Sequence, residues 1–147
     1  MELYHITWSS NVDSIFREGI RPSLGGADGP GVYAWIGDLK DVLKNADCMM
    51  FDGTTLTEEE QIDKMHKFTV LRIELPFSMD DPDVFDRWLN TWWEDYVVLR
   101  DGVPPEYIVE VGNFGDLCLK YSSATENEGY VSKYGVNRYE MFYFSVG

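Results

Sequence analysis

Apolar residues divide the first third of the chain into two strand-like and two helix-like segments. Residues 3–7 are rich in aromatic and β-branched side chains, which predicts a strand. Residues 12–16 place apolar side chains at helical spacing, and Gly19 ends the helix as a C′ residue. Residues 31–36 read as a second strand. Asp38 then precedes a second helix, whose apolar positions follow the i, i+3, i+4, i+7 pattern: Leu39, Val42, Leu43 and Ala46.

The remainder of the chain is richer in strand patterns. Thr57 and Glu60 have capping-box spacing and predict a helix that ends near Lys67, after a loop at 47–55. Asp81-Pro82 is typical of a helix start, and the apolar face expected there comprises Val84, Phe85, Trp88, Leu89 and Trp92. Strands are predicted at 68–75, 96–99, 107–111, 117–121 and 139–145, with an acidic loop at 122–129.

The order of these elements indicates the fold class. Helices gather early in the chain and strands late, which favours an α+β fold with a split or curved, mostly antiparallel sheet. The 147 residues suit a single domain, and residues 1–147 contain no internal repeat or linker.

Charge narrows the range of partners. The chain has 12 basic and 26 acidic residues, a formal net charge of −14, which repels phosphate backbones and makes direct nucleic-acid binding unexpected. Small molecules in a pocket and basic proteins remain as natural partners. Aromatic residues make up 15 %, so some are available to stack on a flat ring as well as to fill the core.

Several classes of protein are disfavoured by what the sequence lacks. Cys48 and Cys118 have no CxxC spacing, so neither a zinc site nor a disulfide framework is predicted, and no metal is expected. The first residues lack the pattern of a signal peptide, and no apolar run is long enough to span a membrane. We therefore expect a cytoplasmic protein without a membrane partner.

The residues from His5 to Tyr33 form an ordered set that indicates a binding site. His5 lies on the first predicted strand, and the helix that follows ends in Gly19-Ile20. A glycine-rich loop and then Gly31-Val32-Tyr33 complete the set. This order resembles the ADP-ribosyltransferase superfamily, in its diphtheria-toxin-like and poly(ADP-ribose) polymerase-like branch. The resemblance covers residues 3–46 and beyond them rests on element order alone, and it implies an ADP-ribosyltransferase-like domain.

The resemblance implies that NAD is the bound substrate and gives five residues a role. Tyr33 would offer its ring to the cationic nicotinamide, a contact of roughly 0.5–2 kcal/mol. His5 would bind ribose hydroxyls, Ile6 would hold the nicotinamide amide through its backbone, and Thr7 would add a hydroxyl contact. Arg21, after the helix, would reach the pyrophosphate.

The same resemblance calls for a carboxylate at the start of a late strand. Such a group stabilises the oxocarbenium-like transition state and holds the attacking group. Glu106 follows two prolines that cannot donate ladder hydrogen bonds, so it stands where a strand begins and is the predicted catalytic residue. Glu110 and Glu128 are the alternatives.

The sequence also departs from this branch. The polymerases carry a serine and a second stacking tyrosine on the helix after the second strand, where this chain has Asp41 and Asn45. Ile6 replaces a smaller residue. Trp35, or an aromatic residue within 81–93, would have to replace the second ring. Polymer synthesis is therefore disfavoured. The related tRNA 2′-phosphotransferases need basic residues for a phosphorylated RNA, and the charge of −14 argues against them.

These observations lead to one functional hypothesis and two alternatives. The first is an NAD-dependent mono-ADP-ribosyltransferase acting on a macromolecule, with a basic protein as a candidate target; its small size resembles bacterial or phage effectors. The second is a catalytically inactive module that binds NAD or ADP-ribose. The third is an acidic protein inhibitor that mimics the charge of nucleic acid.

Overall fold

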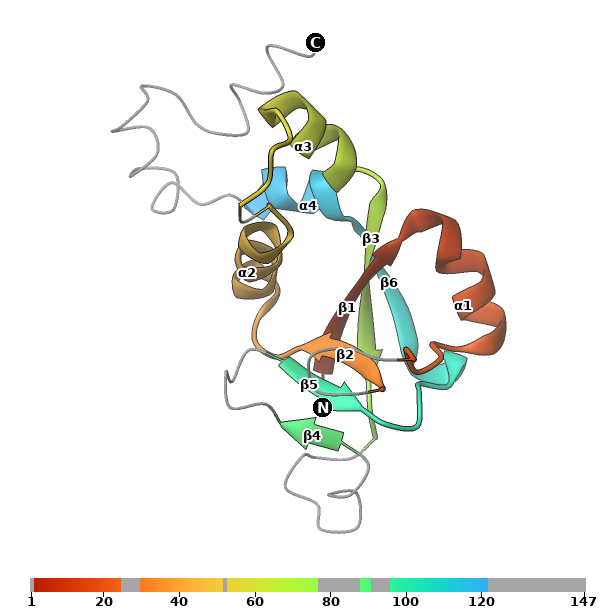
Figure 1. The fold of residues 1–147 in the computed structure, drawn as a ribbon. Coiled ribbons are helices and arrows are strands. Elements are labelled where there is room, and N and C mark those ends of the chain that lie inside the picture. The colour runs from red at the N-terminus through yellow and green to blue at the C-terminus, as the bar shows by residue number, and fades with distance from the viewer. Residues whose placement is uncertain (1, 25–29, 52, 77–87, 91–95, 122–147) are drawn as a thin grey trace.

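The structure, a computed structural model, describes residues 2–24, 30–51, 53–76, 88–90 and 96–121 (Figure 1). Six strands form one sheet in the order β4-β5-β2-β1-β3-β6, and all neighbouring strands are antiparallel. The α+β class and the antiparallel sheet confirm the predicted fold class. The strands are β1 (Glu2–Trp8), β2 (Val32–Trp35), β3 (Phe68–Glu74), β4 (Trp88–Asn90), β5 (Tyr96–Leu99) and β6 (Ile108–Asn113).

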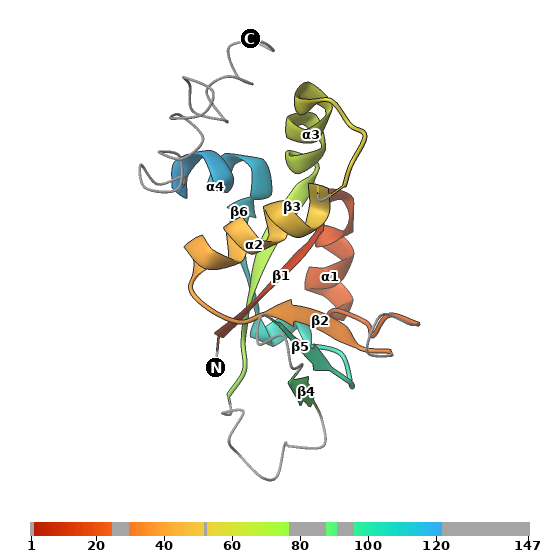
Figure 2. The same cartoon turned by 60° about the vertical axis from the view of Figure 1, so that its left-hand side comes forward.

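Helices cover both faces of this sheet. One face carries α1, and the other carries the remaining α-helices of the described chain, as the two views show (Figures 1 and 2). The α-helices are α1 (Val12–Glu18), α2 (Leu39–Phe51), α3 (Glu58–Met65) and α4 (Phe114–Tyr121). Two short 3-10 helices, η1 (Ser9–Asn11) and η3 (Pro105–Tyr107), precede α1 and β6.

The alternation of side chains along β1 and β3 separates two apolar cores. Leu3 and Ile73 point to the α1 side, where Ile15 and Ile20 complete the packing. Tyr4 points to the opposite side, into a core built from residues of α2, α3 and α4. Each core buries a continuous apolar face of the sheet, which is the main stabilising term of such a layered fold.

The sheet is nearly split between β1 and β2. β1 pairs with β3 along its whole length, from Glu2 opposite Glu74 to Trp8 opposite Phe68. By contrast, β1 and β2 share a single register pair, Tyr4 with Trp35. Figure 1 shows β2 and β5 running across the direction of β1 and β3. The two halves therefore diverge beyond Tyr4, and a cavity lies at this divergence.

Several local predictions are confirmed by hydrogen bonds. Thr57 and Glu60 form the reciprocal capping box of α3, with bonds of 3.2 and 3.1 Å between side chain and backbone. The Asp38 side chain accepts a bond from the Asp41 amide at the start of α2. Gly19 is the C-cap of α1.

Three predicted elements were wrong. Residues 117–121 belong to α4 and not to a strand, because Phe114, Leu117, Cys118 and Tyr121 follow helical spacing behind a capping Asn113. The loop predicted at 47–55 begins later, since α2 continues to Phe51. Trp88–Asn90 is a strand paired with β5, so tertiary pairing overrides the helical pattern predicted there.

Other predictions lie outside the described residues. These are the helix start at 81–87, the acidic loop at 122–129 with Glu128, and the last strand at 139–145.

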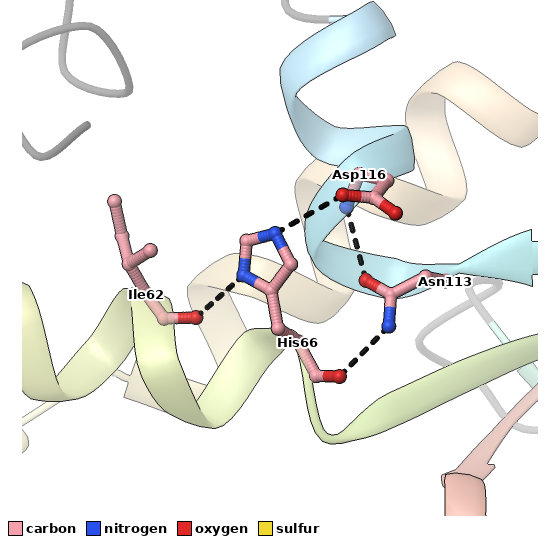
Figure 3. Close-up of polar contacts among 4 residues, drawn as sticks. All are labelled: Ile62, His66, Asn113 and Asp116. Atoms are coloured by element: carbon pink, nitrogen blue, oxygen red, sulfur yellow. Dashed lines mark hydrogen bonds and ion pairs between the residues drawn. The ribbon is translucent and has the colours of Figure 1, made fainter. Parts of the chain in front are cut away.

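Polar contacts join α3, β6 and α4 on the face opposite α1 (Figure 3). The His66 Nδ1–H donates to the Ile62 carbonyl at 2.9 Å, and Nε2 lies 3.2 Å from Asp116 Oδ1. The Asn113 side chain bonds to both segments. Its Nδ2 donates to the His66 carbonyl at 2.7 Å, and its Oδ1 accepts from the backbone amide of Asp116 at 3.1 Å. Asn113 therefore caps α4 and fixes it to the end of α3.

We predict that Asn113→Ala lowers the free energy of unfolding by about 1–2 kcal/mol, because both the cap and the donor to the His66 carbonyl are lost. Asn113→Ser keeps a capping hydroxyl but not the longer reach, so it should lose less. Urea denaturation followed by circular dichroism measures the difference. Wild-type stability in the alanine variant would contradict this role.

Candidate functional site

A cavity of about 420 Å³ opens between β1, α1 and β2. It is lined by four of the five predicted cofactor-binding residues, His5, Thr7, Arg21 and Tyr33. They come from β1, the segment after α1, and β2, and are separated by up to 28 residues in sequence. The polar residues that sequence reasoning did not assign to the site, but which also line it, are Asn11, Ser14, Glu18 and Ser23.

Strand alternation and one glycine place these residues. His5 and Thr7 share the face of β1 that looks toward α1. Gly19 then turns the chain with φ +83°, and a Cβ there would collide with the Val103 carbonyl oxygen. Ile20 exchanges two backbone hydrogen bonds with Val103, at 2.8 and 2.9 Å. This pairing fixes the chain just before Arg21.

A second contact, between Ser23 and Gly31, joins the two ends of the glycine-rich segment beside the cavity. The Ser23 amide and hydroxyl both donate to the Gly31 carbonyl at 2.9 Å. The ends of the glycine-rich segment therefore meet beside Val32 and Tyr33, and both ends line the cavity.

The protonation of His5 follows from its hydrogen bond. Nδ1 lies 2.8 Å from the Tyr33 carbonyl oxygen, and because a carbonyl only accepts, Nδ1 carries the proton. Burial lowers the pKa of His5 below 6.5, outweighing the opposite effect of this bond, so the ring is neutral near pH 7. Nε2 then carries a lone pair, and the cavity presents a hydrogen-bond acceptor at His5.

The Tyr33 ring belongs to a small aromatic group. Val32 and Ala34 point into the core beside α1, so Tyr33 and Trp35 point to the other face of β2. The Tyr33 and Tyr96 ring centroids are 5.8 Å apart, and those of Trp35 and Tyr96 are 6.4 Å apart. Sequence reasoning named Trp35 as a replacement for the missing ring but not Tyr96, because only the pairing of β2 with β5 brings Tyr96 beside Tyr33.

Ile6 does not line the cavity. Its side chain packs on the opposite face of the sheet, with the core beside α2 and α4. The predicted contact of Ile6 with the nicotinamide amide uses the backbone of Ile6 and not its side chain. Among the described residues, β1 has no register partner in β2 beyond Tyr4.

The predicted catalytic carboxylate is not part of this cavity. Glu106 is exposed on η3, directly before β6, and is absent from the cavity lining. Glu110 is exposed on β6, at the edge of the sheet, and does not line the cavity either. Among the described residues, the carboxylate that lines the cavity is Glu18, in the last turn of α1.

No family model, curated protein or solved structure matches this chain. The resemblance therefore stays a prediction that rests on the ordered residues of the sequence. Within the described ranges, no three His, Cys, Asp or Glu side chains gather as a metal site. No helix of that part is long and apolar enough to cross a membrane.

The lowered pKa of His5 predicts a pH dependence of stability. Below pH 6.5 the unfolded chain binds a proton at this residue that the folded chain resists. The free energy of unfolding therefore falls as the pH drops from about 6.5 toward the folded pKa, by at most about 1.4 kcal/mol per pH unit. Above about pH 6.5, His5 is neutral in both the folded and the unfolded chain, so its protonation no longer lowers the free energy of unfolding.

Urea denaturation at pH 7.5, 6.5 and 5.5 tests this. Asn at position 5 can donate to the Tyr33 carbonyl but does not titrate, so His5→Asn should lose less stability on acidification than wild type. Equal losses in both proteins would refute the assignment.

Proposed function

We propose that this cavity binds NAD, and that the protein is an NAD-dependent mono-ADP-ribosyltransferase acting on a macromolecular target, with a basic protein as the expected partner. The observation that carries the proposal is that His5, Thr7, Arg21 and Tyr33 line one cavity. The sequence resemblance assigns these four residues to NAD.

The size and polarity of the cavity support a nucleotide ligand. Its volume of about 420 Å³ lies within the usual range of small-molecule sites, about 300–1,000 Å³. The neutral His5 would accept a hydrogen bond from a ribose hydroxyl through Nε2. Thr7, Asn11 and Ser14 offer further hydroxyl and amide groups, and Arg21 would bind the diphosphate.

Among the described residues, Tyr33 is the Phe, Tyr or Trp residue that lines the cavity, and the proposal assigns it to the cationic end of NAD. An aromatic ring attracts a cationic ring through its quadrupole. Tyr33 would supply this surface. The Tyr96 ring packs beside Tyr33, and Trp35 packs on Tyr96. Neither Tyr96 nor Trp35 lines the cavity, so in the proposal they support the Tyr33 ring and do not replace the second stacking residue absent at Asn45.

The position of Glu106 favours a second candidate. Transfer requires cleavage of the bond between ribose and nicotinamide, and a carboxylate near that ribose lowers the barrier. Because Glu106 does not line the cavity, a module that binds NAD or ADP-ribose without turnover is the alternative. The charge of −14 leaves an acidic inhibitor as a third reading, one that needs no nucleotide.

Calorimetric titration with NAD tests the binding step. We predict saturable binding that Arg21→Ala weakens about 10- to 100-fold, because a charged hydrogen bond is worth about 1.5–3 kcal/mol. His5→Asn should weaken it about 5- to 10-fold, because the acceptor Nε2 is lost. Arg17→Ala is the matched control for Arg21→Ala: Arg17 is an exposed arginine on α1, four residues before Arg21, and does not line the cavity. The absence of NAD binding by wild type would reject the proposal.

Turnover separates the transferase from the binding module. Wild type is incubated with labelled NAD and a cell lysate, and both nicotinamide release and labelled macromolecules are measured. The transferase hypothesis with Glu106 as its carboxylate predicts a rate at least 100-fold lower in Glu106→Gln, the scale of losing a group that stabilises the transition state, whereas the position of Glu106 outside the cavity predicts no change. Glu110→Gln should have little effect. Binding without any product would select the binding module, and an unchanged rate in Glu106→Gln would remove Glu106 from the mechanism.

A further inference from the structure

An ion pair of exposed side chains lies along the cavity, with Arg21 retaining 79 % and Glu18 54 % of its accessible surface. Arg21 Nη2 is 2.9 Å from Glu18 Oε2, and both residues line the cavity. The pair joins the last turn of α1 to the segment fixed by Ile20 and Val103. Glu18 therefore lies beside the residue proposed to bind phosphate.

The pair determines the charge that a ligand meets. In the part of the chain that the structure describes, Arg21 is the cation and Glu18 the carboxylate among the lining residues, and His5 is neutral near pH 7. The two charges cancel, within a chain whose net charge is −14. A phosphate that approaches Arg21 must therefore compete with Glu18 for the guanidinium and also meet a like charge.

We propose that Glu18 is a specificity-determining residue of the cavity, which admits nucleotides carrying a diphosphate and rejects those with a further phosphate. The inference rests on the proposed NAD binding and adds the selection against more highly charged nucleotides. NAD fits this site because its cationic ring offsets part of the diphosphate charge. NADP adds a phosphomonoester, with about 1.5–2 further negative charges at pH 7.

The chain offers a matched control for Glu18. Asp13 lies on the same helix and is exposed, but it does not line the cavity. Glu18→Gln and Asp13→Asn remove the same charge from the protein. An effect of the net charge of the protein on nucleotide affinity should be similar in both variants. An effect of the local charge beside Arg21 should appear only in Glu18→Gln.

The experiment is calorimetric titration of wild type, Glu18→Gln and Asp13→Asn with NAD, NADP and ADP-ribose at low ionic strength, where charge effects are least screened. Wild type should bind NAD at least about 10-fold more tightly than NADP. Glu18→Gln should reduce this ratio about three- to tenfold by tightening NADP binding most, and Asp13→Asn should leave the ratio unchanged. Circular dichroism and urea denaturation confirm that the variants are folded.

Two failures are distinguishable. If wild type binds NAD but the ratio is equal to one, or does not change in Glu18→Gln relative to Asp13→Asn, the role of Glu18 is overturned and the proposed function stands. If wild type binds none of the three nucleotides, the proposed function fails and this inference fails with it.

Discussion

The hydrogen bond from His5 Nδ1 to the Tyr33 carbonyl spans the point where the sheet nearly divides. β1 and β2 share only the pair of Tyr4 with Trp35, so backbone pairing alone holds the two halves together at one position. The 2.8 Å bond adds a second tie close to the cavity. It also fixes the His5 tautomer, because the carbonyl accepts only from a protonated Nδ1. A single contact thus links the architecture of the sheet to the chemistry that the cavity offers.

The other wall of the cavity depends on a backbone constraint. Gly19 adopts φ +83° within van der Waals contact of Val103, a position where a side chain would collide with the backbone. The Ile20–Val103 bonds then hold the end of α1 against the segment that leads to η3 and β6. In this way a turn early in the chain is positioned by residues about 80 positions later. Glu18 and Arg21 flank this turn, and their exposed side chains meet there as an ion pair.

The charges on the surface and in the cavity determine which ligands and partners suit the proposed function. An acidic surface repels polyanions at a distance, while the cavity wall presents a neutral ion pair and a neutral histidine. Such a site suits a ligand whose negative charge is partly offset by a cationic ring. The same surface is complementary to a basic protein. A nucleotide inside and a basic target outside are therefore compatible in one small domain.

The sequence by itself determined features that depend on neighbouring residues. These include the strands around His5 and Tyr33, the α3 capping box and the Gly19 cap, because spacing and capping act within a few positions. The helical spacing of Phe114 to Tyr121 is also present in the sequence, although a strand is predicted at 117–121. Only the tertiary structure decided that Glu106 lies outside the cavity, that Glu18 lies inside it, and that Tyr96 meets Tyr33. Those relations depend on strand order and on the pairing of distant segments, which local patterns do not specify.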